Sequence, residues 1–293
     1  TGQNFTSSLS DIFFEQLQLR KPDYHLMKAH HSIGEQLSTT FLELERILLK
    51  EMPDTMLVLG DTNSALTAVL AERMGIPVVH MEAGNRCFDL QVPEEINRKV
   101  IDAVSSINMP YTKQSKQNLI QEGVPTSRIV LTGNPIYEVL SHYKMQIQKS
   151  TILEQLKLEP KDYFLATIHR AENVDEPAHL AEIMKGLHEV AVTNEKRIIL
   201  STHPRTKARL QEGLLRRLSP LVEFHEPFGF FEFVKLEQHA LCVLTDSGTV
   251  QEECCIFHVP AVTVRKTTER PETVDCGSNT VTGIHANRIS EAV

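Results

Sequence analysis

Met56-Leu57-Val58-Leu59, closed by Gly60-Asp61, and Val78-Val79-His80-Met81 are the two stretches that decide the fold. Each apolar run has the length and composition of a buried strand. The segment between them is apolar at helical spacing until Gly75-Ile76-Pro77 breaks it, with apolar positions at Leu66, Val69, Leu70 and Met74. Strand, helix and strand in this order predict one β-α-β unit.

The same alternation extends in both directions from this unit. Upstream, a helix is predicted by the apolar spacing of Leu37, Phe41, Leu44 and Leu48. Downstream, we expect a helix over 180–190 and strands over 163–168, 197–201, 241–245 and 261–264. This pattern predicts an α/β protein with two parallel-sheet domains, each covered by helices. The polar segment 143–151 divides them, giving domains 1–145 and 146–293.

The composition argues against several kinds of partner and site. The chain has 293 residues and a formal net charge of −8, and an acidic surface argues against nucleic acid. No apolar run is long enough to span a membrane, and the first residues lack the pattern of a signal peptide. The five cysteines fit no zinc pattern. We therefore expect reduced thiols in a cytoplasmic protein with no metal site.

Polar side chains follow the predicted strands in both halves of the chain. In open α/β sheets, ligands bind at the carboxyl ends of strands. The polar groups at these ends are Asp61, Glu82, His169, His203, Asp246 and Ser247. Because they occur in both halves, the sequence predicts a cleft between the two domains.

The segment from Thr245 to Glu253 predicts an anion site. A strand ends, Asp246-Ser247-Gly248 turns the chain, and a helix begins. Free N–H groups at a helix start favour an anion, and Gly248 lets a phosphate approach the backbone. Two alternatives stay open: Ser247 caps the helix and does nothing more, and Glu253 is either a ribose contact or a solvated helix residue.

Carboxylates are dense in the first half of the chain. Asp61 and Glu82 follow strands, and Glu94-Glu95 precede Ile96-Asn97-Arg98. Neighbouring carboxylates disfavour double ionisation and can divide general-acid and general-base work. The alternative is a metal site, which needs convergent oxygen ligands at short range.

Three further segments are candidates for binding. His169-Arg170 ends a strand, and both residue types pair with phosphate oxygens. The run from Phe228 to Phe233 contains Gly229, which makes it loop-like, and a ring such as Phe233 could border a flat base, although core packing also explains these rings. The charged turn Thr268-Glu269-Arg270-Pro271-Glu272 would lie near the other strand ends, or form an ordinary surface loop.

Taken in order, these motifs resemble the non-hydrolysing UDP-N-acetylglucosamine 2-epimerases over nearly the whole chain. The segments that carry the resemblance are Gly60-Asp61-Thr62, His80-Met81-Glu82-Ala83-Gly84, Pro93-Glu94-Glu95-Ile96-Asn97-Arg98, His169-Arg170-Ala171-Glu172-Asn173, Thr245-Asp246-Ser247-Gly248 with Gln251-Glu252-Glu253, and Glu269-Arg270-Pro271-Glu272. Each motif is weak alone, but six in one order are specific.

The resemblance implies two Rossmann-like domains in the GT-B arrangement, a homodimer and a UDP-sugar substrate. It implies that a base removes the C2 proton, that UDP leaves as a 2-acetamidoglycal forms, and that UDP returns after a proton is delivered to the other face. No nicotinamide or metal is required, which agrees with the absence of a Gly-x-Gly-x-x-Gly motif.

The resemblance also implies roles for individual residues. Asp61, Glu82 and Glu94 are similar to the family's catalytic carboxylates, and His169 to a diphosphate contact with a part in catalysis. The residues expected to bind substrate are Gln3, Arg98, Arg170, His203, Phe228, Phe233, Ser247, Gly248, Glu253 and Arg270. Which carboxylate acts as the base stays open.

The sequence departs from the family pattern at both ends, so we expect a chain cut at its N-terminus and at its C-terminus. Asn85-Arg86-Cys87-Phe88-Asp89 is similar to a capsule and O-antigen branch. That branch includes UDP-N-acetyl-L-fucosamine synthases and enzymes acting on diacetamido uronic acids. A GT-B glycosyltransferase and a non-catalytic nucleotide-sugar sensor are the alternatives outside the family.

Overall fold

The computed structural model describes residues 11–26 and 32–293. The chain divides into two compact units. Of the described residues, 20–26 and 32–135 form the first unit, and 11–19 and 136–293 form the second. The two parallel sheets expected from the sequence are confirmed, one in each unit.

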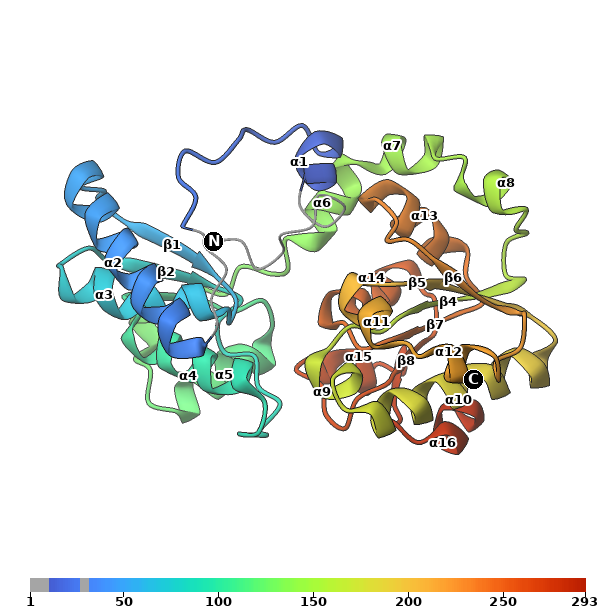
Figure 1. Cartoon of the computed structure of the whole chain (residues 1–293). Helices are drawn as coiled ribbons and strands as arrows, with labels where there is room; N and C mark the ends of the chain where they lie inside the picture. The colour runs from blue at the N-terminus through green and yellow to red at the C-terminus, as the bar shows by residue number, and fades with distance from the viewer. Residues whose placement is uncertain (1–10, 27–31) are drawn as a thin grey trace. The chain divides into compact units, whose positions relative to one another are not determined.

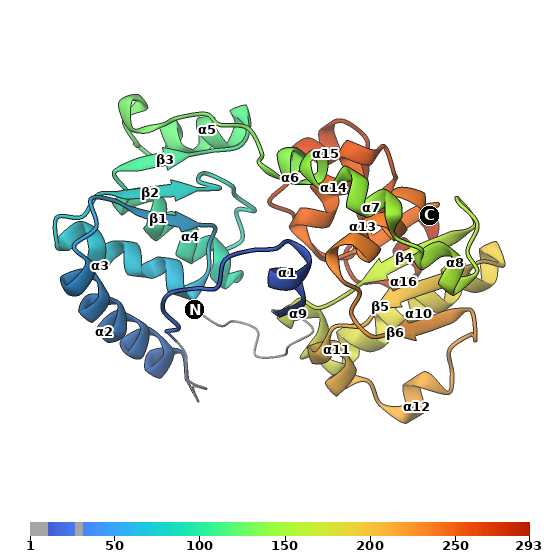
Figure 2. The ribbon, with the colours of Figure 1, turned by 90° about the horizontal axis from the view of Figure 1, so that it is seen from above.

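The sheet of the first unit has the order β1-β2-β3, with all pairs parallel. Its strands are β1 (Met56–Leu59), β2 (Val78–Met81) and β3 (Ile107–Met109). The helices of this unit are α2 (Ile33–Glu51), α3 (Ala68–Arg73), α4 (Pro93–Val104) and α5 (Lys113–Gln121), with 3-10 turns η2 (Asn63–Thr67) and η3 (Thr126–Arg128). Figure 2 shows the three strands side by side.

Two predictions for the first unit need correction. The segment 64–74 begins as the 3-10 turn η2, in which Thr62 caps Ala65, and becomes α-helical only at Ala68. The strand β1 is not buried on both faces, because Val58 faces the core whereas Leu57 and Leu59 are 62% and 58% exposed. The core on the Val58 side is formed with residues of α2, η2, α3 and α4, whereas Leu57 and Leu59 point to the opposite face of the strand.

The second unit has a six-stranded parallel sheet in the order β6-β5-β4-β7-β8-β9. The strands are β4 (Tyr163–Thr167), β5 (Arg197–Ser201), β6 (Val222–His225), β7 (Cys242–Thr245), β8 (Ala261–Thr263) and β9 (Asn279–Val281). The order reverses between β4 and β7, as it does in doubly wound nucleotide-binding sheets. Ligands of such sheets bind at this switch point, where His169 and Ser247 follow the two strands.

Helices cover both faces of this sheet (Figure 1). Phe164 and Ala166 of β4 face a core shared with α10 (Pro177–Asn194) and α16 (Ala286–Glu291), while Tyr163 and Leu165 face the opposite core. That second core includes residues of α13 (Phe230–His239) and α14 (Gly248–Phe257). The remaining helices are α1 (Asp11–Gln16), α6 (Ile136–His142), α7 (Lys144–Lys149), α8 (Ile152–Leu156), α9 (Ala171–Val174), α11 (Pro204–Arg209), α12 (Glu212–Leu215) and α15 (Pro271–Asp275).

The main segment of the second unit begins at Ile136, before the expected division at 145/146. Leu140 of α6 and Ile147 of α7 pack with Val234 of α13, so this polar-looking segment belongs to the second unit. The hydroxyl of Tyr143 also donates to the carbonyl of Leu17, 2.8 Å away, which ties the end of α1 to the same unit.

Candidate functional site

In the first unit, Arg98 joins the two strand-end carboxylates. Asp61 follows β1, Glu82 follows β2, and Arg98 reaches both from α4. Its Nη2 atom pairs with Asp61 Oδ2 and lies 3.4 Å from Glu82 Oε1. The arginine is buried, whereas both carboxylates keep part of their surface exposed. We call Asp61, Glu82 and Arg98 the Arg98 cluster; it can present two acidic groups to a ligand while a buried cation limits their repulsion.

The backbone around this cluster is unusual at Gly60 and Glu82. Glu82 has a φ of 65°, in the left-handed region that non-glycine residues rarely occupy. Gly60 has a φ of 70°, and a Cβ there would lie 3.2 Å from Glu82 Oε2. Non-glycine residues held in this region concentrate at functional sites, and Glu82 is such a residue, paired with Arg98.

Asp102 fixes the loop that carries Glu82, although it was not among the residues predicted from the sequence. This buried carboxylate lies 2.8 Å from His80 Nδ1 and 2.7 Å from Arg86 Nη2, and it accepts from the backbone N–H of Gly84. The other ring nitrogen of His80 lies 2.9 Å from the Gly60 carbonyl. Burial lowers the pKa of Arg86, but Glu122 and Asp102 outweigh this effect and the pKa is raised. The spacing 94, 98, 102 on one helix could have revealed Asp102, because residues four apart share a face.

Glu94 lies in the first turn of α4, four residues before Arg98 and half-buried. The spacing puts it on the same helix face as Arg98. Its neighbour Glu95 has a structural role instead, because it is buried and accepts from the backbone N–H of Cys87 at 2.9 Å.

In the second unit, the Asp246 carboxylate organises the turn after β4. It is fully buried and accepts from the backbone N–H of His169 at 3.0 and 3.1 Å and from that of Arg170 at 2.9 Å. Asn173 adds a side-chain bond at 3.0 Å. We call His169, Arg170 and Asp246 the Asp246 turn. It holds two residues predicted to bind substrate at the switch point, and Asp246 itself was not among the predicted site residues.

His203 follows β5 and lies beside His169. The centroids of the two rings are 5.5 Å apart. His203 Nδ1 accepts from the backbone N–H of Arg205 at 3.1 Å, so in the neutral ring Nε2 carries the proton and can donate. Burial, followed by the charge of His169, lowers the pKa of His203.

Ser247 occupies the N-cap position of α14 but makes no side-chain capping bond. The capping role considered for it is therefore wrong, and the hydroxyl is not engaged by the first turn of the helix. Gly248 begins the helix, and a Cβ there would stand 3.5 Å from the guanidinium carbon of Arg270. Arg270 pairs with Glu252 at 2.6 Å, so a buried cation stands beside the helix start.

The segment 268–272 is not a surface loop, contrary to the alternative considered. Glu269 and Arg270 are only 6% and 8% exposed. Glu269 makes two bonds of 2.9 Å to Arg265. Burial raises the pKa of Glu269, but Arg265, with Arg170 and Arg270, outweighs this and holds the pKa at about 2. Several arginines thus converge near the start of α14, which favours an anionic ligand.

Glu253 is buried, so the prediction of a solvated helix residue is wrong. It lies beside Glu237 of α13, which is fully buried and accepts from the Cys254 thiol at 3.1 Å. Burial raises the pKa of Glu253 to about 8 and also raises that of Glu237. Burial and the charge of the neighbouring carboxyl both disfavour the ionised form, so the pair favours holding a proton.

The loop-like prediction for 228–233 holds only to Gly229, because α13 begins at Phe230. Phe228 and Phe233 are half-buried and pack against the core cluster that includes Val250 of α14. Both rings therefore lie near the same helix as Ser247.

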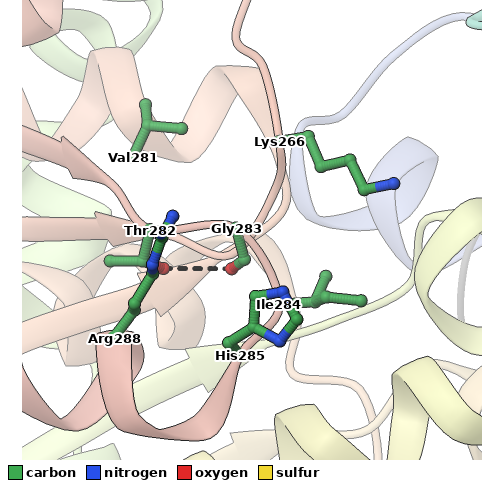
Figure 3. A pocket seen from close by; sticks show the side chains of 7 residues that line it. All are labelled: Lys266, Val281, Thr282, Gly283, Ile284, His285 and Arg288. Atoms are coloured by element: carbon green, nitrogen blue, oxygen red, sulfur yellow. Dashed lines mark hydrogen bonds between the residues drawn. The ribbon is translucent and has the colours of Figure 1, made fainter.

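One cavity of about 270 Å³ lies at the ends of β8 and β9 (Figure 3). Its lining consists of Lys266, Val281, Thr282, Gly283, Ile284, His285 and Arg288. None of these residues was predicted to be part of the site. Gln3 lies outside the described residues. Within residues 11–26 and 32–293, no group of three His, Cys, Asp or Glu side chains could hold a metal ion, and no helix is long and apolar enough to cross a membrane.

Known proteins match this chain along its whole length. The family model described as UDP-N-acetylglucosamine 2-epimerase matches residues 1–293. The UDP-N-acetylglucosamine 2-epimerase of Methanocaldococcus jannaschii is 42% identical, over all of this chain and 82% of the relative. The UDP-2,3-diacetamido-2,3-dideoxy-D-glucuronate 2-epimerase of Pseudomonas aeruginosa is 39% identical, over all of this chain and 81% of the relative.

A solved structure of one of these relatives has the same fold as this chain. The crystal structure of the M. jannaschii enzyme in complex with UDP-GlcNAc and UDP superposes with a TM-score of 0.94 at 41% identity, covering all of this chain and 82% of the other. With the family model matching from end to end, the chain belongs to the UDP-N-acetylglucosamine 2-epimerase family of isomerases.

Proposed function

We propose that this chain inverts C2 of a UDP-N-acetylhexosamine, converting UDP-N-acetylglucosamine to UDP-N-acetylmannosamine. The observation that carries the proposal is the Arg98 cluster, in which two strand-end carboxylates share one buried arginine. A glycosyltransferase needs a nucleotide site but does not need such a pair. Proton removal and delivery at one carbon need two positioned acid–base groups.

The reaction would proceed by elimination and re-addition. A carboxylate takes the C2 proton, the C1–O bond breaks as the C1=C2 double bond forms, and UDP leaves with the bonding pair. A proton then reaches the opposite face of C2 while the diphosphate oxygen rebinds C1. Asp61, Glu82 and Glu94 are the candidates for the proton transfers, with His169 as a further one.

The second unit would bind the UDP moiety. The helix start at Ser247 and Gly248, together with His169, His203, Arg170 and Arg270, offers N–H, imidazole and guanidinium donors. These donors suit the charge that grows on a departing diphosphate. Glu253 would accept from ribose hydroxyls, and Phe228 and Phe233 would border the uracil. Arg98 and Gln3 complete the proposed set on the sugar side.

Exchange of the C2 hydrogen tests the proposal. Incubated with UDP-N-acetylglucosamine in deuterated water, the protein should incorporate deuterium at C2 of both epimers, as followed by NMR. If UDP-N-acetylglucosamine and its diacetamido-uronate counterpart both keep their C2 hydrogen, the proposal fails. Release of free UDP with transfer of sugar to an acceptor would instead favour a glycosyltransferase.

A diacetamido uronic acid is the second candidate substrate, favoured by the 39% identical relative named for that activity. Comparing kcat/KM for the two UDP-sugars decides between them. We also propose a homodimer, which light scattering coupled to size-exclusion chromatography measures directly.

A further inference from the structure

Cys255 of α14 and Cys276, at the end of α15, form a close pair of thiols. Their sulfur atoms are 3.6 Å apart. Both belong to the second unit, so the distance lies within one compact body. A disulfide needs about 2.05 Å between sulfurs, so the gap to close is small.

The surroundings of the two thiols suit oxidation. Cys276 is exposed, and a backbone hydrogen bond from Ser278 lowers its pKa, which raises the fraction of reactive thiolate. Cys255 is half-buried, and burial raises its pKa. An exposed thiol with a lowered pKa beside a less accessible second thiol is the usual arrangement of an attacking and a resolving cysteine.

The local backbone can accommodate the bond. Gly277 follows Cys276 with a φ of 79°, and nothing lies within 4 Å of where its Cβ would stand. The turn into β9 therefore has room to adjust. By contrast, Cys254 does not compete for Cys276, because it is buried and donates to Glu237 at 3.1 Å.

We propose that Cys255 and Cys276 are a redox modification site that small disulfides such as oxidised glutathione convert to an intramolecular disulfide. The Cys276 thiolate attacks one sulfur of the oxidant, whose S–S bond breaks and releases one glutathione thiolate. The Cys255 thiolate then attacks the Cys276 sulfur and displaces the second glutathione. The two protein thiols lose two electrons and two protons, and the oxidant becomes two glutathione thiols.

The bond would join α14 and α15 away from the proposed anion site. These helices already meet where Arg270 pairs with Glu252, and Cys276 lies six residues further along, about 9 Å at 1.5 Å per residue. Cross-linking this end should leave the start of α14 undisturbed. It should raise the melting temperature of the second unit by roughly 5–10 °C, because the loop between the cysteines is restrained in the unfolded chain.

Mass spectrometry after equilibration with oxidised glutathione and blocking of free thiols tests the proposal. We expect the protein to lose two hydrogen atoms and to yield one Cys255–Cys276 linked peptide. Cys255→Ser should stop at a mixed disulfide carrying one glutathione, and Cys276→Ser should give no linked peptide. Cys87→Ser, at a buried thiol of the first unit, is the matched control and should behave as the unmodified protein.

Three results would overturn the inference: Cys255 and Cys276 both staying free thiols, a mixed disulfide at Cys276 that persists with Cys255 present, or a Cys276 cross-link between two molecules. A linked peptide without a higher melting temperature would contradict only the expected gain in stability. None of these readouts depends on the proposed function. UDP affinity, measured on the oxidised and reduced protein, should agree within about twofold; a larger change would contradict the claim that the start of α14 is undisturbed.

Discussion

The Asp246 carboxylate lies 3.0 Å from the backbone nitrogen of His169 and 3.4 Å from its Nδ1 atom. One buried acid therefore sets both the backbone position and the ring environment of a predicted catalytic residue. Asp246→Asn would replace one acceptor oxygen with an amide donor facing N–H groups. We expect a loss of about 2–3 kcal/mol in the free energy of unfolding, measured by urea denaturation, and at least tenfold weaker UDP binding. Unchanged UDP affinity would show that this turn does not position the diphosphate contacts.

Asp61→Asn should separate catalysis from binding. Asparagine keeps the size of the side chain but cannot take a proton, so turnover should fall by more than about 100-fold. UDP affinity, measured by calorimetry, should change less than about twofold. Asp54→Asn is the matched control, because Asp54 is exposed just before β1, and it should leave both quantities unchanged.

Ser247→Ala should weaken UDP binding, which Asp61→Asn should leave nearly unchanged. The Ser247 hydroxyl makes no capping bond, so its loss should cost little stability. A lost hydrogen bond to a charged ligand costs roughly 1.5–3 kcal/mol, which corresponds to UDP binding about ten-fold weaker or more. If Asp61→Asn and Ser247→Ala weaken UDP binding equally, the proposed division of labour between the two sets of residues is wrong.

The Glu253 carboxyl should make stability depend on pH. Its pKa is raised from 4.5 to about 8 by burial, followed by the charge of Glu252, so the folded protein binds a proton that the unfolded chain releases. The stabilisation is full below about pH 4.5 and is lost as the pH rises to about 8. In Glu253→Gln the side chain stays neutral, and the free energy of unfolding should fall less steeply over this range. Equal slopes for the two proteins would contradict the buried, protonated pair with Glu237.

The sequence predicted the parts of the fold that repeat regularly. The strands β1 and β2 were predicted with the bounds found in the structure, and the order of motifs led to the family. The strands β3, β6 and β9 were missed because polar residues interrupt their apolar runs. Asn108 of β3, for example, is buried and donates to the carbonyl of Asp102 at 3.0 Å. Contacts of this kind form only when the chain folds, so the spacing of apolar residues in the sequence does not predict them.

The candidate site was also predicted only in part, because some of its contacts form only on folding. The ends of the predicted strands pointed to Asp61 and Glu82 in the first sheet and to His169 and Ser247 in the second. In each parallel sheet the carboxyl ends of the strands lie at the same edge. The burial of Glu253 could not be read in this way, since an acidic helix residue is ordinarily solvated and becomes tolerable in a core only beside a partner such as Glu237. The role of Asp246 was missed because its partners are mostly backbone N–H groups.

Gly186 of α10 lies against α16, and adding a side chain there should destabilise the second unit. A Cβ there would stand 3.0 Å from Ile289 Cδ1 and 3.2 Å from the backbone of Ala286. Because the backbone atom cannot move alone, Gly186→Ala should cost about 1–3 kcal/mol, seen as a lower urea midpoint with an unchanged slope. Gly213→Ala in α12 is the matched control, since nothing lies within 4 Å of its added methyl group; there the same change should stabilise by about 0.4–1 kcal/mol. A neutral Gly186→Ala would mean that α16 shifts freely on α10, contrary to the close packing of Ile289 against this helix.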